Sequence, residues 1–283
     1  MHAHHVPGSL GIAVRPELAD VEERMLAMDR AGIAIQVLSP FVNLSADLRD
    51  PATAVPYARR FNEAMAQTVR ANPRRFLALA TVPADGGPGE LEYAVRQLGM
   101  AGVQMAASPR GPGLEHRDTL WAAAEELGCL VFIHPTRGTG DALPYGLDNL
   151  VGNPAETTTA IARMILGGVF DRFPGLRVCV AHGGGFLPWQ IGRLERGAEV
   201  FGPRLSRSPR EVLSDLYFDT ILHDPATLAH LNPARLLLGT DHPFEMGDRN
   251  PHATIAAIPG LTPAERAAIT HHNAQALLSP FLP

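Results

Sequence analysis

The chain has 283 residues, of which 46% are hydrophobic and 19% charged, and its formal net charge is -5. We expect a single domain over residues 1–283, because prolines and glycines are spread along the chain and no linker is visible. No basic cluster indicates nucleic acid, and no apolar run approaches the roughly 18 residues that cross a bilayer. No signal peptide is visible. Cys129 and Cys179 lie in apolar runs and are predicted to be buried free thiols of a cytoplasmic protein rather than a disulfide.

Short apolar runs alternate with longer amphipathic ones. Most of the short runs are continuously apolar, which is typical of strands buried on both faces in a parallel sheet. The predicted strands are 2–6, 33–39, 76–82, 102–107, 129–134, 177–182, 216–222 and 235–241. The predicted helices are 16–31, 53–71, 90–100, 118–128, 154–170, 187–200 and 262–278.

This alternation predicts an α/β fold, a (β/α)8 TIM barrel. An open, doubly wound sheet is the alternative. Its usual dinucleotide-binding form is excluded, because no G-x-G-x-x-G motif follows an early strand.

Histidine and aspartate residues lie on four of the predicted strands. His2 and His4 share a face of the first strand, His134 and His182 end two middle strands, and Asp241 ends the last. The carboxyl ends of barrel strands meet at one face, and imidazole and carboxylate are ligands for a divalent metal. Alone, the His-rich start could be the remnant of an expression tag. Together these residues predict a metal site.

Longer stretches resemble a known family. The pattern of His-x-His, two further histidines and a final aspartate is that of the amidohydrolase superfamily. The resemblance runs from about residue 15 to 278. It is most specific to decarboxylases related to α-amino-β-carboxymuconate-ε-semialdehyde decarboxylase, whose corresponding segments are similar to LVGNPAETTTAIARMILGGVFDRFPGLRVCVAHGGG, FDTILHDP and LLLGTDHPF.

The resemblance implies a metal centre of the amidohydrolase type. Zinc and a water would be held by His2, His4, His134 and Asp241, and manganese or cobalt could use the same ligands. His182 would be the catalytic base beside that water. Asp241 would also help to move protons.

The resemblance also implies substrate-binding residues. Arg15 and Arg193 match two family arginines that hold substrate carboxylates, and the second of these reaches the neighbouring subunit's site. A homodimer that shares Arg193 is therefore expected. Phe244 is retained from the family motif on the last strand and is predicted to contact the substrate, a small carboxylic acid.

Several positions depart from the family. Met1 directly precedes His2, so we expect a truncated first strand, and the segment between His5 and Arg15 is short. The decarboxylase has a tryptophan and other aromatic residues in the loop after the strand-end histidine, where this chain has Thr136, Arg137, Gly146 and Asn149. It also has a tyrosine after the final aspartate, where this chain has His242.

Three functions follow from these observations. We favour a zinc-dependent, non-oxidative decarboxylase of an unsaturated or aromatic acid with one or two carboxylates. A metal-dependent hydrolase of an amide, lactone or related carbonyl compound is the alternative, favoured by the substitutions after His134. A barrel that holds no metal and serves as a binding scaffold is the third. Asp224 is predicted to cap a helix, and Trp189 lines either the pocket or an interface.

Overall fold

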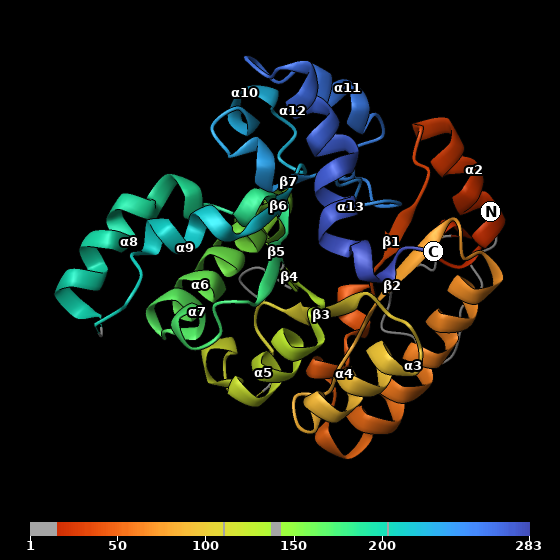
Figure 1. Cartoon of the computed structure of the whole chain (residues 1–283), viewed down its shortest axis with the longest axis horizontal. Coiled ribbons are helices and arrows are strands. Elements are labelled where there is room, and N and C mark those ends of the chain that lie inside the picture. Colours follow the sequence, from red (N-terminus) through yellow and green to blue (C-terminus); the bar gives the residue numbers. More distant parts are fainter. Residues whose placement is uncertain (1–15, 110, 137–142, 203) are drawn as a thin grey trace.

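The computed structural model describes residues 16–109, 111–136, 143–202 and 204–283 (Figure 1). The predicted first strand with His2 and His4 lies outside the described residues, and so do Arg15 and Arg137.

Within the described residues, seven parallel strands form one sheet, and their spatial order is their order in the sequence. The third and fourth strands show the register, since Gly102 pairs with Leu130 and Ala106 with His134. The strands are β1 Gln36–Leu38, β2 Phe76–Ala80, β3 Gly102–Ala106, β4 Leu130–His134, β5 Arg177–Val180, β6 Tyr217–Asp219 and β7 Leu236–Leu237. All seven lie within the predicted strand ranges. This sheet is the curled parallel sheet of the predicted (β/α)8 barrel.

Helices surround the strands, and α8 and α9 project to one side of the sheet (Figure 1). The helices after β1 to β5 connect parallel neighbours, as in a barrel. The helices are α1 Pro16–Ala19, α2 Val21–Ala31, α3 Pro51–Ala71, α4 Gly87–Arg96, α5 Asp118–Leu127, α6 Asn153–Leu166, α7 Val169–Arg172, α8 Leu187–Phe201, α9 Pro209–Asp215, α10 Pro225–Leu228, α11 Pro251–Ala256, α12 Pro263–Ala267 and α13 Asn273–Leu278. None formed by the described residues is long and apolar enough to cross a bilayer.

Three predicted helices are divided in the structure. The range 16–31 is interrupted at Asp20, whose carboxylate accepts hydrogen bonds from the first backbone N–H groups of α2. The range 154–170 is interrupted at Gly168, which has a φ of 69° between α6 and α7. The range 262–278 contains a π-helical turn at Ala268–His272. Asp224 caps α10, as predicted.

Alternate residues of the strands pack on opposite faces. On β4, Val131 and Ile133 are fully buried in the cluster that includes the surrounding helices. Leu130 faces the other way and packs with Cys179 of β5 and Leu277 of α13 inside the barrel. Both cysteines are buried free thiols, as predicted. The same alternation turns His134 towards the barrel interior at the carboxyl end of β4.

Candidate metal centre

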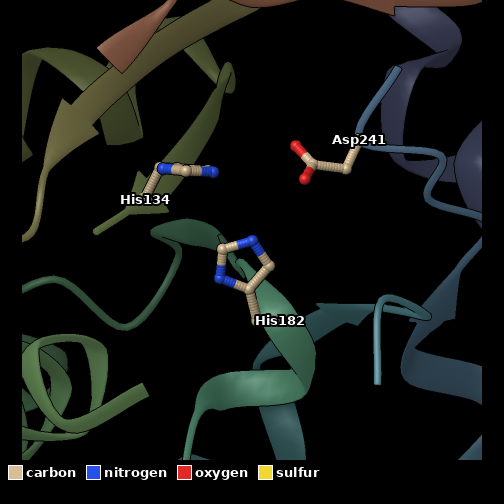
Figure 2. A group of neighbouring side chains, drawn as sticks. All are labelled: His134, His182 and Asp241. Carbon is tan, nitrogen blue, oxygen red and sulfur yellow. The ribbon is translucent and has the colours of Figure 1, made fainter. Parts of the chain in front are cut away.

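Three of the predicted site residues lie together at the carboxyl ends of the strands. His134 is the last residue of β4, His182 follows β5, and Asp241 lies four residues after the end of β7. Their possible ligand atoms all lie within 4.8 Å of one another. Figure 2 shows the two rings and the carboxylate pointing into a common space. Residues from three different strands therefore converge, as the parallel topology predicts.

The backbone is in an unusual conformation at this centre. His182 has a φ of 55° and Asp241 a φ of 49°, in the left-handed region that non-glycine residues seldom adopt. His223, in the loop after β6, has a φ of 58°. Such conformations cost about 1–3 kcal/mol each and persist where the surrounding structure fixes them. Here they turn two strand-end side chains into the same space.

Asp219, the last residue of β6, is a site residue that the sequence analysis missed. Its Oδ1 accepts hydrogen bonds from the backbone N–H of Gly183, at 3.2 Å, and of Ile221, at 3.1 Å. A Cβ at Gly239 would lie only 2.9 Å from the Asp219 Cβ, so a glycine there leaves room for this carboxylate. Asp219 thus holds the turn that carries His182. An acidic residue at the end of an otherwise apolar strand was the available signal.

Burial and neighbouring charges lower the pKa values of the two imidazoles. Burial lowers the pKa of His134 to about 4, with a smaller contribution from the adjacent His182. Burial also lowers the pKa of His182 to about 4, with a smaller contribution from His223. Both rings are therefore neutral at pH 7, which is the form that binds a metal or accepts a proton.

The pKa of the acidic residue at the centre shifts in the opposite direction. Burial raises the pKa of Asp241 to about 7, and the nearby carboxylate of Asp219 contributes to the rise. Two carboxylates close together disfavour each other's ionisation. A divalent cation between these groups would favour the ionised form, so the charges of the donor set fit a cation.

The hydrogen bonding of His134 fits a metal ligand as well. Its Nδ1 lies 2.7 Å from the carbonyl oxygen of Pro135. Because a carbonyl only accepts, Nδ1 carries the proton and Nε2 keeps its lone pair. Histidines that bind metals commonly donate their other ring N–H to a carbonyl or carboxylate in this way. Donor type, orientation and spacing at the centre therefore all suit a divalent metal.

A cavity extends through the barrel interior, and the three residues of the centre line it at this end. Phe244 also lines it and stacks on Phe41, with ring centroids 5.2 Å apart and planes at 27°. Phe41 follows β1 and had no signal in the sequence. Trp189 of α8 also lines the cavity and is 49% exposed, so of its two predicted positions the structure favours the pocket.

Of the two arginines predicted to bind substrate, the structure describes only Arg193. Arg193 lies on the exposed surface of α8 and does not line the cavity of its own chain. It forms no ion pair with the described residues. Arg15, His2 and His4 lie outside the described residues. The role of each in binding metal or substrate stays a prediction.

The sequence of residues 1–279 matches the amidohydrolase family. The chain belongs to this family. It is 36% identical over 255 residues to a 2-amino-3-carboxymuconate-6-semialdehyde decarboxylase of Dictyostelium discoideum, which covers 84% of this chain and 71% of the relative.

Solved structures show the same fold. The crystal structure of a 5-carboxyvanillate decarboxylase from Sphingomonas paucimobilis superposes with a TM-score of 0.86 at 27% identity, over 95% of this chain and 87% of that one. A dihydroxybenzoic acid decarboxylase from Polaromonas, solved with bound manganese and 2-nitroresorcinol, has a TM-score of 0.79 at 22% identity, over 92% and 86%.

These comparisons confirm the predicted family and barrel fold. They also agree with the prediction of a carboxy-lyase, since the relatives are named as decarboxylases. The choice of zinc as the metal stays a prediction.

Proposed function

We propose that this protein is a metal-dependent, non-oxidative decarboxylase of an unsaturated or aromatic carboxylic acid. The observation that carries the proposal is the convergence of His134, His182 and Asp241 within 4.8 Å at a cavity with a stacked phenylalanine pair. The decarboxylase relatives support the reaction type. A flat, conjugated acid suits such a cavity, because aromatic rings stack favourably on one another.

The proposed ligands of the metal are His2, His4, His134 and Asp241. Zinc is the metal we favour for three imidazoles and one carboxylate, and manganese or cobalt would suit the same donors. When bound, the cation supplies positive charge that stabilises developing negative charge on oxygen. The protein's contribution is to fix the donors, and the Pro135 carbonyl orients His134 for this purpose.

His182 is the proposed proton carrier. As a neutral imidazole it takes a proton from water or from an acidic group of the substrate. It then delivers this proton to the ring or chain carbon that bears the carboxylate. The carbon–carbon bond breaks, its electron pair returns to the conjugated system, and carbon dioxide leaves. Asp219 keeps His182 in place through the Gly183 N–H, and Phe244 packs against the conjugated skeleton.

Arg15 and Arg193 are the proposed residues that hold the substrate carboxylates, since a guanidinium grips a carboxylate with two hydrogen bonds. Arg193 would do so in the partner of a homodimer. Its exposure on α8, away from its own cavity, supports this arrangement. A cytoplasmic location stays a prediction.

Release of carbon dioxide tests the reaction. The metal-loaded protein is assayed with a panel of aromatic and unsaturated acids, and in parallel with amides and lactones. We expect carbon dioxide from at least one acid and a loss of about a hundredfold or more in kcat for His182→Ala at unchanged metal content. Hydrolysis of an amide or lactone without carbon dioxide release would instead establish the hydrolase. Full turnover by His182→Ala would remove His182 from the mechanism.

Mixing inactive subunits tests the shared arginine. His182→Ala and Arg193→Ala chains are each expected to be nearly inactive alone. In a mixed dimer, one site regains His182 from one chain and Arg193 from the other. Equal mixing is therefore expected to restore about a quarter of the wild-type activity. No recovery, although mixed dimers are detected by mass, would contradict a shared site.

A further inference from the structure

We propose that Arg49 binds a second anionic group of the substrate, a carboxylate or phenolate other than the carboxylate that is lost. This inference rests on the proposed function, because it assumes an acid as the ligand of the cavity. It adds a binding residue on the chain's own side of the pocket, independent of Arg15 and Arg193.

Arg49 belongs to a well-anchored loop. The loop 39–50 connects β1 to α3 at the carboxyl end of the strands, where the metal centre lies. The side-chain amide of Gln104 on β3 donates to the Pro40 carbonyl at 2.7 Å. The backbone N–H of Ala46 donates to Thr81 Oγ1, also at 2.7 Å. Both bonds are buried, so the loop is a rigid support for a binding residue.

The side chain of Arg49 is held in a fixed position. Its Nη2 donates to the carbonyl oxygen of Asn43 at 2.7 Å, and its guanidinium carbon lies 4.9 Å from the centroid of the Tyr57 ring. The Tyr57 hydroxyl in turn donates to the Leu44 carbonyl at 2.6 Å. These contacts order the guanidinium before any ligand arrives, which lowers the entropic cost of binding.

The charge of Arg49 is not paired within the described part of the chain. No described carboxylate lies within ion-pair distance of it, and its Nε is shielded from solvent without a hydrogen-bond partner. A shielded cation without a counter-ion costs free energy, which an anion in contact would offset. Arg49 lines the same cavity as His134 and Asp241, so a ligand of that cavity can supply the anion.

A short series of contacts connects Arg49 to the metal centre. Phe244 donates its backbone N–H to the Asp241 carbonyl at 2.9 Å and stacks on Phe41. Phe41 lies two residues before Asn43, the residue that anchors Arg49. Phe41, Phe244 and Arg49 all line the cavity, so a ring that packs against the two phenylalanines, with one carboxylate at the metal centre, can place another substituent against Arg49.

The other described arginine of the cavity is placed differently. Arg24 of α2 also lines it, but its Nη1 donates to the side chain of Gln36, at the amino end of β1. The amino ends of the strands lie opposite the metal centre. Arg49 is therefore the described arginine that is suited to a ligand at the carboxyl end.

The test compares acids that differ by one carboxylate. Calorimetry measures the binding of benzoate, isophthalate and terephthalate to the metal-loaded wild type, Arg49→Gln and Arg49→Lys. The matched control is Arg60→Gln, which removes an exposed positive charge from the neighbouring helix α3. Thermal unfolding of each variant establishes that it is folded.

We expect the wild type to bind one of the two diacids more tightly than benzoate. Arg49→Gln should weaken that diacid by about tenfold to a hundredfold, while benzoate changes by less than about twofold. Arg49→Lys should lie between, and Arg60→Gln should match the wild type. An equal loss for mono- and diacids, or no loss at all, would overturn the proposal.

Binding also separates this proposal from the proposed reaction. If no acid releases carbon dioxide but Arg49→Gln selectively loses the diacid, the reaction is wrong and Arg49 is an anion-binding residue. If an acid is decarboxylated and the diacid preference is the same in wild type and Arg49→Gln, the reaction stands and the Arg49 proposal fails.

Discussion

Inward-facing strand residues line both ends of the barrel interior, but their side chains differ in chemistry and role between the two ends. At the amino end of β4, Leu130 is 6% exposed and packs with Leu277 of α13. At the carboxyl end of the same strand, His134 points into the metal centre. Every second residue of a strand points inward, so one short strand contributes to both ends. The difference shows that stability and chemistry are separated along the strand axis, and substitutions at the two ends should have separable effects.

The largest effect is expected at the polar end. Asp241→Ala removes the carboxylate of the proposed metal site, and we expect less than one bound metal per chain. Because a bound cation supplies several kcal/mol of charge stabilisation, turnover should fall about a thousandfold or more. Metal analysis and kcat/KM measure the two effects.

The matched control for Asp241→Ala is Asp171→Ala. Asp171 accepts a hydrogen bond from the Ser206 backbone N–H at 2.8 Å and does not line the cavity. Its replacement should cost about 1 kcal/mol of stability and leave metal content intact. Stoichiometric metal in Asp241→Ala would exclude this residue from the site.

The sequence was sufficient to predict the sheet. The continuous apolar runs located all seven described strands, because a strand buried on both faces leaves that pattern. It also placed His134, His182 and Asp241 near one another, since parallel strands bring their carboxyl ends together. Helix divisions were missed where Asp20 and Gly168 interrupt an apolar period that otherwise continues.

Other site residues depended on tertiary contacts. Phe41 and Phe244 are distant in sequence, and their stacking follows from the packing of two loops. The sequence pattern of Asp219 is that of a half-buried strand residue, and its role depends on the hydrogen bond that it accepts from the Gly183 N–H. Arg49 sits in a loop whose path is set by Gln104 and other strand residues, which no local pattern encodes.

The next effect is expected at the apolar end. Leu130→Ala removes packing against α13 and enlarges the interior cavity, and we expect a loss of about 2–5 kcal/mol in the free energy of unfolding. The metal centre lies at the other end of the strand, so kcat per folded chain should stay within about twofold of the wild type. Urea denaturation measures the first quantity and steady-state kinetics the second. A large fall in kcat of the folded variant would show that the two ends are coupled.

The smallest effect concerns the pH dependence of metal binding at the polar end. The pKa of Asp241 is raised to about 7, so below pH 7 a metal must displace a proton from this carboxyl. Protonation of Asp241 alone should therefore lower metal affinity about tenfold for each pH unit below 7, whereas His134 and His182 gain protons, and add to the slope, near pH 4. Competition with a chelator between pH 5 and 8 measures the slope.

Asp219→Asn tests the cause of this dependence. Removing the negative charge beside Asp241 should lower the pKa of Asp241 and move the onset of the fall to lower pH. The onset should move only part of the way to the ordinary carboxyl value, because burial is the larger cause and is unchanged. Asparagine retains an oxygen that can accept the Gly183 N–H, so the turn that carries His182 should be preserved. An unchanged onset would mean that burial alone sets the pKa of Asp241, and that the metal centre is insulated from the carboxylate at the end of β6.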